Sequence, residues 1–184
     1  MTGQHDAGTG KPDATASEEQ AFDLAEVEAL FLNASRDGQA DLVQEFVAAG
    51  LSPDLSNEKG HSALILATYN GHAEATKVLL DAGATIDLRD AKGATALAGV
   101  AFKGEIEIAR MLLEAGAQVD AANEVGRTPL MFAVMFGRLD MAKLLIEAGA
   151  NPTLRDGEGR DARDIAVALG SEPMQELLGD GTAR

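Results

Sequence analysis

The 184-residue sequence contains no cysteine and no tryptophan, and only 4% of its residues are aromatic. Without cysteine, the chain can form neither a disulfide framework nor a thiolate metal site. Its histidines, His5, His61 and His72, have no partner at the spacing of a catalytic pair or a zinc site. No GxxxxGK[ST] phosphate loop, GxSxG elbow or HExxH pair occurs either. We therefore expect neither enzyme activity nor a cofactor.

Long apolar runs and positive charge are also scarce. No uninterrupted apolar run approaches the length of a membrane span, and the N-terminus has no apolar segment of the signal-peptide type. These features predict a soluble, cytoplasmic protein without a membrane partner. The net charge of −15 argues against a nucleic-acid partner, because phosphate contacts require clustered lysine and arginine.

Glycine, by contrast, is abundant and regularly spaced. It recurs at intervals of 33 residues in three series, which are Gly60, Gly93, Gly126 and Gly159; Gly38, Gly71, Gly104, Gly137 and Gly170; and Gly50, Gly83, Gly116 and Gly149. A fixed period of this size indicates one supersecondary unit stacked on copies of itself, because such a unit cannot bury its apolar face alone.

Each copy has the signals of two antiparallel helices followed by a hairpin-like loop. Ser62, Thr95 or Thr128 stands where a hydroxyl can cap the first helix. A glycine separates the two helices, and another follows the second helix at the C′ position. The loop keeps a polar residue that can hold a turn through its side chain, at Asn57, Asp90, Asn123 and Asp156.

The segment Thr128-Pro129-Leu130-Met131-Phe132-Ala133 resembles the TPLHxA opening of the ankyrin repeat, which is also 33 residues long. A glycine before the second helix, a Leu-Leu pair and a following Ala-Gly-Ala extend the resemblance over roughly residues 27–181. The resemblance implies an all-α solenoid of antiparallel helix pairs, like the small ankyrin proteins of bacteria. The histidine of the motif is replaced in every copy, by Ile65, Ala98, Met131 and Asp164, so we expect apolar stacking in its place.

Six segments are predicted: a disordered tail (1–17), a divergent N-terminal capping repeat (18–59), three full repeats (60–92, 93–125 and 126–158) and a C-terminal capping repeat (159–181). Ser17 to Gln20 matches a capping box, and apolar residues then recur at helical spacing, at Phe22, Val27, Leu30, Phe31 and Ala34. Arg163 stands where the full repeats have leucine, which marks the end of the stack. Capped ends predict a monomer.

In the ankyrin family, partners usually dock on the concave face. The resemblance places the exposed pairs of the first helices at Tyr69 and Asn70, Phe102 and Lys103, and Met135 and Phe136. Tyr69, Phe102 and Met135 then form one row, with Phe136 beside it. Aromatic and methionine side chains are typical anchors of protein interfaces. The alternative is that these side chains fill gaps between helices as part of the core.

The loop tips add positive charge to the same face. The resemblance places His61, Arg89, Lys92, Arg127 and Arg160 at or beside the variable tip positions. A basic rim opposite acidic second helices would favour a partner protein with an acidic surface. The alternative is an ordinary mixed, solvated surface.

The sequence therefore predicts a non-catalytic scaffold for protein–protein interaction. Two alternatives stay open: a dedicated inhibitor, immunity or chaperone-like accessory protein of one bacterial enzyme or toxin, and an enzyme regulator to which the tail contributes. An inhibitor would change its partner's turnover, whereas a passive adaptor would bind without changing it.

Overall fold

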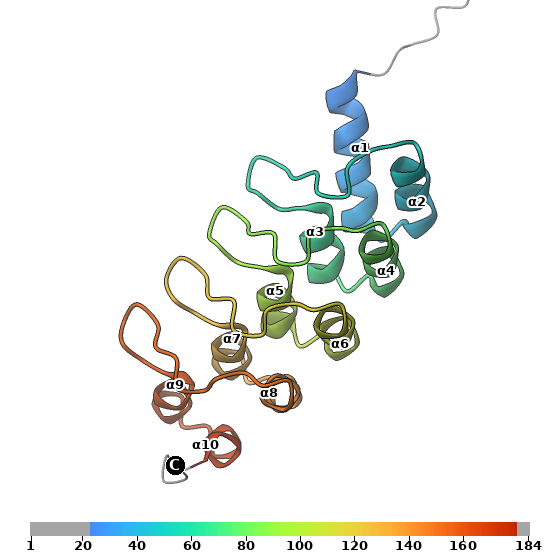
Figure 1. Cartoon of the computed structure of the whole chain (residues 1–184). Helices are drawn as coiled ribbons and strands as arrows, with labels where there is room; N and C mark the ends of the chain where they lie inside the picture. Colours follow the sequence, from blue (N-terminus) through green and yellow to red (C-terminus); the bar gives the residue numbers. More distant parts are fainter. Residues whose placement is uncertain (1–22, 180–184) are drawn as a thin grey trace, which may run out of the picture.

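The computed structural model describes residues 23–179, which form an elongated stack of helix pairs (Figure 1). The helices are α1 (Leu24–Asp37), α2 (Ala40–Ala48), α3 (Ala63–Tyr69), α4 (Ala73–Asp81), α5 (Ala96–Lys103), α6 (Ile106–Glu114), α7 (Pro129–Met135), α8 (Leu139–Glu147), α9 (Ala162–Ala168) and α10 (Glu172–Leu178). The predicted tail and the predicted capping box at Ser17 lie outside the described residues.

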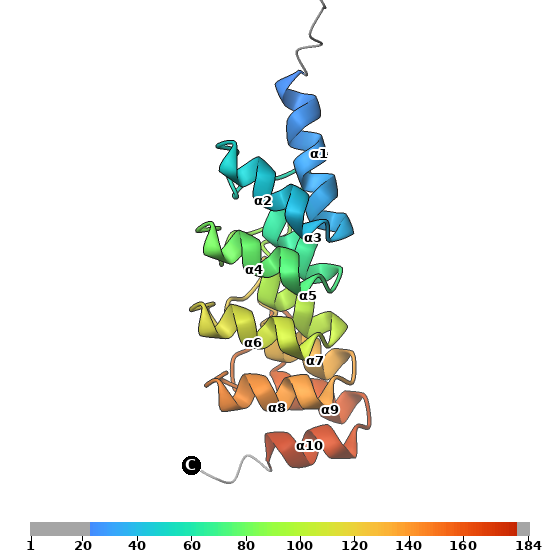
Figure 2. The same ribbon diagram turned by 90° about the vertical axis from the view of Figure 1, so that its right-hand side faces the viewer.

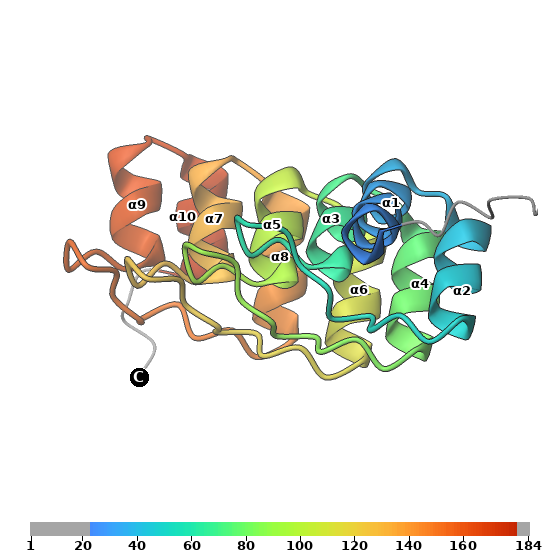
Figure 3. The same cartoon turned by 90° about the horizontal axis from the view of Figure 1, so that it is seen from above.

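The first helices of the pairs (α1, α3, α5, α7 and α9) form one layer, and the second helices (α2, α4, α6, α8 and α10) form the other (Figure 2). A long loop joins each pair to the next, and successive loops follow one another along one side of the stack (Figure 3). Loops and first helices together line one face, which we call the concave face. The predicted all-α stack of antiparallel helix pairs is confirmed.

The predicted caps start the first helices. The Ser62 hydroxyl accepts a hydrogen bond from the backbone N–H of Ile65 at 3.2 Å. Thr95 and Thr128 accept in the same way, at 3.4 and 3.3 Å. In α9 the cap is an aspartate: Asp161 and Asp164 form a reciprocal capping box. Each cap satisfies a backbone N–H that the helix itself leaves without a partner.

The loops pack backbone against backbone. The N–H of Ala91 donates to the carbonyl oxygen of Lys59 in the preceding loop at 3.0 Å, and equivalent bonds of 3.1 and 2.8 Å join the later loops. Gly60 shows why this approach requires glycine: its φ is +73°, and a Cβ there would lie 2.8 Å from the nitrogen of Ala91. The expected side-chain turns are present, since Asn57, Asp90, Asn123 and Asp156 each accept two backbone N–H bonds.

Leucines at one position of each full repeat, Leu64, Leu97 and Leu130, are fully buried between the layers. Arg163 holds the same position in α9, where it is half-buried and its Nη2 atom has no hydrogen-bond partner. In α1, Phe31 is buried and meets the ring of Phe46 edge to face. Leu30, one turn before Ala34 on the same helix, is 47% exposed.

Side chains at the start of the second helices link neighbouring repeats. Nε2 of His72 lies 2.9 Å from the carbonyl oxygen of Arg36. Nε of Arg138 donates to the carbonyl oxygen of Phe102 at 3.2 Å. Glu105 holds the equivalent position between them, where a carboxylate cannot donate such a bond.

Candidate functional site

Three aromatic rings from successive repeats meet on the concave face. Tyr69 ends α3, Phe102 lies in the last turn of α5, and Phe136 follows α7. The rings of Tyr69 and Phe102 are stacked with centroids 6.1 Å apart, and those of Phe102 and Phe136 meet edge to face at 4.2 Å. Both arrangements are favourable for aromatic quadrupoles. We call Tyr69, Phe102 and Phe136 the aromatic cluster.

The cluster is open to solvent at both ends. Tyr69 is 40% exposed and Phe136 is 44% exposed, while Phe102 is half-buried between them. Met135 departs from the expected row, because it is half-buried and packs against the core. Phe136 continues the row in its place. The equivalent residue of the next repeat, Leu169, is also exposed.

The polar neighbours of the rings differ in role. Asn70 is exposed, but its side-chain amide donates to the carbonyl oxygen of Leu66 at 2.8 Å and so closes the end of α3. The ammonium of Lys103 lies 4.8 Å from the centroid of the Tyr69 ring, which is a cation–π contact. Within residues 23–179, no carboxylate lies within 4 Å of that ammonium.

The expected basic rim is largely engaged in internal contacts. Arg89 donates to the carbonyl oxygens of Gly93 and Ala122, and so ties two loops together. Arg127 and Arg160 both pair with carboxylates of the last loop, those of Asp156 and Glu158. His61 is half-buried, with Nε2 3.9 Å from Oδ2 of Asp90. Lys92 is exposed at its loop tip.

In the last loop, between α8 and α9, Asp156 pairs with both Arg127 and Arg160. Burial of its side chain raises its pKa, but hydrogen bonds from the backbone and guanidinium of Arg160 and from the backbone N–H of Glu158 outweigh burial, so the pKa lies below its ordinary value. The carboxylate therefore stays charged and holds Arg160 at 3.1 Å. The positive charge of this loop is neutralised by the loop itself.

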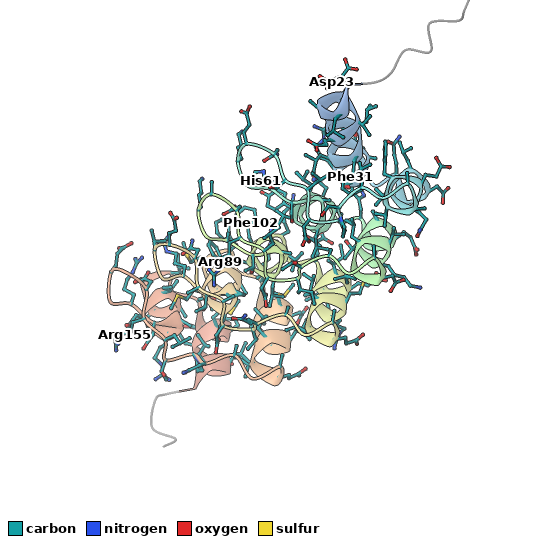
Figure 4. The ribbon with its side chains drawn as sticks, turned by 45° about the horizontal axis from the view of Figure 1, so that its top comes forward. Asp23, Phe31, His61, Arg89, Phe102 and Arg155 are labelled. Atoms are coloured by element: carbon teal, nitrogen blue, oxygen red, sulfur yellow. The ribbon has the colours of Figure 1, made fainter. Side chains whose placement is uncertain are left out.

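The concave face is hollowed beside the aromatic cluster. A groove of about 360 Å³ runs between α3 and α5, from His61 and Asp90 at the loops to Tyr69 and Phe102. Figure 4 shows His61 and Phe102 on this side, where the loops meet the first helices. Gly99 of α5 lines the groove, and reasoning from the sequence missed it. The available signal was that Gly99 belongs to none of the three glycine series and falls inside a predicted helix.

The model of the ankyrin-repeat family, described as ankyrin repeats in three copies, matches residues 30–123 and 102–182. The chain belongs to the ankyrin-repeat family. A search of the curated proteins found no match to it. Ankyrin repeats generally mediate protein–protein interaction, and the face that the resemblance singled out is the face that carries the aromatic cluster and the groove.

Among residues 23–179, no group of three or more histidine, aspartate or glutamate side chains is placed to hold a metal ion. His61 and His72 lie apart in different contacts, with Asp90 and with the Arg36 carbonyl, while His5 lies outside the described residues. No helix in the described part of the chain is long and apolar enough to cross a membrane.

Proposed function

We propose that this ankyrin array is a non-catalytic scaffold that binds a partner protein through its concave face. The aromatic cluster carries the proposal. Solvent-exposed aromatic rings offer a large apolar area with few rotatable bonds, and such side chains dominate the binding energy of many interfaces. The half-buried Phe102 holds Tyr69 and Phe136 in place before a partner arrives, which reduces the entropy lost on binding.

Charge supports a partner with an acidic surface. Lys59, Lys92 and Lys103 are exposed on the concave face, and no carboxylate of residues 23–179 lies within 4 Å of their ammonium groups. The second helices carry more exposed carboxylates, at Glu74, Asp81, Glu107, Glu114, Asp140 and Glu147, although the loop tips also expose Glu58, Glu124 and Glu158. An acidic partner would be repelled more strongly by the second helices than by the concave face, which favours one orientation.

We expect the array to act as a monomer in the cytoplasm, with neither nucleic acid nor membrane as partner. The half-buried Arg163 opposes the stacking of another copy on α9, because covering a charged group without a partner is costly. Sedimentation equilibrium tests the monomer. A stable dimer that the Tyr69→Ala/Phe136→Ala variant abolishes would make the partner a second copy of this chain.

Affinity capture from the native lysate tests the proposed function. The wild type is compared with Tyr69→Ala/Phe136→Ala, and with Glu74→Ala/Glu107→Ala on the exposed side of α4 and α6 as a matched control. The proposal predicts that one partner is retained by the wild type and by the control, and is lost from the aromatic variant while that variant stays helical. Retention by the aromatic variant and loss from the control would move the binding site to the second helices.

An activity assay of the captured partner distinguishes an inhibitor from a passive accessory protein. If the captured protein is an enzyme or a toxin, its turnover is measured with and without one equivalent of the array. A stoichiometric loss of turnover identifies an inhibitor, and unchanged turnover identifies a tether.

A further inference from the structure

Gly99 leaves a gap in a row of large side chains on the concave face. It lies inside α5, and the equivalent residues of the neighbouring repeats are Leu66 and Phe132. Glycine in a helix interior is less favourable than alanine. Its backbone here does not have the positive φ that would require glycine. Gly99 has no conformational need to be glycine, and it lines the groove beside the Tyr69 ring; we call this part of the groove the Gly99 notch.

The apolar walls of the notch are Ile65, Leu66, Tyr69, Ala98, Phe102 and Phe132. The groove around it is also lined by the polar residues His61, Asp90 and Thr95. The Tyr69 ring packs closely against the glycine: a Cβ on residue 99 would lie only 3.3 Å from Cδ2 of Tyr69, so any side chain there would push the ring aside. Only an apolar group fits these walls without losing hydrogen bonds to water.

The notch opens into a longer groove. A second hollow, of about 450 Å³, shares the lining residues His61 and Leu66 with the groove beside Gly99. It lies along α1 and the tip of the loop between α2 and α3, where Arg36 and Lys59 line it. The combined groove crosses three first helices, α1, α3 and α5. This elongated form suits an extended polypeptide segment better than a compact small molecule.

The charged groups along the groove differ in their pairing. Arg36 pairs with Asp37, and His61 lies beside Asp90. Glu58 and Lys59 are exposed at the loop tip. At the opposite end, Lys103 rests on the Tyr69 ring and has no carboxylate within 4 Å in the described part of the chain. A carboxylate bound beside the notch would give Lys103 the ion-pair partner that it lacks.

We infer that the Gly99 notch receives one leucine-sized or phenylalanine-sized side chain of an extended partner segment, and that a neighbouring aspartate or glutamate of the segment pairs with Lys103. The inference rests on the proposed function and adds the chemistry of the segment to it. The notch supplies affinity through apolar burial, and Lys103 supplies register and direction.

Gly99→Leu is the decisive variant, because it fills the notch with the residue that the preceding repeat carries at the same position. Leucine favours helix more than glycine does, although its Cβ would displace the Tyr69 ring slightly. Circular dichroism and thermal unfolding verify that α5 keeps its fold. Gly99→Ala fills the notch only in part and serves as the second variant. Lys103→Glu tests the charge, with Lys77→Glu on the exposed side of α4 as the matched control.

The probe is a library of random dodecapeptides displayed on phage and selected on the wild-type protein. We expect the enriched peptides to share one large apolar residue with an aspartate or glutamate within two positions. A synthetic peptide of that type should bind Gly99→Leu at least about tenfold more weakly than wild type, Gly99→Ala by less, and Lys103→Glu by about tenfold. Lys77→Glu should bind it unchanged.

Three outcomes would overturn the inference: enriched peptides that bind Gly99→Leu as well as wild type, enriched peptides that are basic, or no enrichment at all. These outcomes differ from a failure of the proposed function. If the peptides bind the Gly99 variants as tightly as wild type but do not bind Tyr69→Ala/Phe136→Ala, the concave face remains the interface, but the notch is not part of it. If the peptides bind both sets of variants as tightly as wild type, the concave face is excluded as their binding site.

Discussion

The rings of Phe102 and Phe136 meet edge to face with centroids 4.2 Å apart, although the two residues belong to successive repeats. Phe102 also stacks on Tyr69, so it contacts both of the exposed rings. Favourable aromatic pairs contribute about 0.5–1.5 kcal/mol each beyond their buried area. The aromatic cluster is therefore part of the stack's stability as well as a candidate interface.

This double role predicts unequal effects of truncation on stability. Phe102→Ala should lower the free energy of unfolding by about 2 kcal/mol, because it removes both ring contacts and a half-buried side chain. Tyr69→Ala and Phe136→Ala should each cost about 1 kcal/mol or less, since each removes only one ring–ring contact and an exposed side chain. Urea denaturation of the three variants measures the difference. Equal losses would mean that Phe102 does not hold the cluster together.

Restoring a hydrogen bond between neighbouring repeats at position 105 should stabilise the array. His72 and Arg138 each bond a carbonyl oxygen of the preceding repeat, whereas Glu105 at the equivalent position cannot donate. We predict that Glu105→His is more stable than Glu105→Ala by about 1 kcal/mol, the usual net value of one hydrogen bond. The alanine variant is the reference because both changes remove the negative charge from the start of α6. Thermal unfolding of both variants gives the comparison, and no difference would contradict it.

The last loop should weaken in acid through Asp156. Because its folded-state pKa is lowered, the stability that this carboxylate contributes is present above the unfolded-state pKa of about 3.9 and is lost as the pH falls through the folded-state pKa. Asp156→Asn keeps a turn-forming side chain, as at Asn57 and Asn123, but removes the charge. The variant should be less stable than wild type at pH 7, and the gap should shrink below about pH 4.

Urea denaturation at pH 7 and pH 3 measures that gap. Glu158→Gln is the control, because Glu158 pairs with the same arginines but is 61% exposed. A surface ion pair of this kind contributes little. A gap that widens in acid would contradict the role given to Asp156.

The second helix of the first full repeat should open most readily among the internal helices. Ala73 and Ala75 stand where the later repeats carry Ile106 and Ile108, or Leu139 and Met141, so α4 has less apolar side chain to bury. Amide exchange in Ala73–Leu80 should be faster than in Ile106–Leu113, as hydrogen–deuterium exchange with mass spectrometry can show. Slower exchange in Ala73–Leu80 would contradict the prediction.

The repeat was predictable from the sequence because its signals are local and occur three times in register. The hydroxyl of Ser62 and the turn at Asn57 act within four residues of themselves, so the spacing of residues is enough to place them. The stacked loops follow from the same period, since each copy must meet the next one in the same way.

Features that depend on distances between repeats were harder to predict. The period places Met135 in the row, but the ring that reaches Phe102 belongs to Phe136, and the direction of a side chain is not encoded in the spacing. Arg127 and Arg160 were expected at an open rim, yet their partners Asp156 and Glu158 come from the last loop. The Gly99 notch exists only because its neighbours Leu66 and Phe132 are large.

Site-specific photo-crosslinking in the native lysate tests the central claim most directly. A photoreactive phenylalanine analogue replaces Tyr69 or Phe136 on the concave face, and replaces the exposed Glu107 of α6 as the control. We predict that the same partner is crosslinked from positions 69 and 136, but not from position 107. A partner crosslinked from position 107 alone would contradict it and place recognition on the second helices.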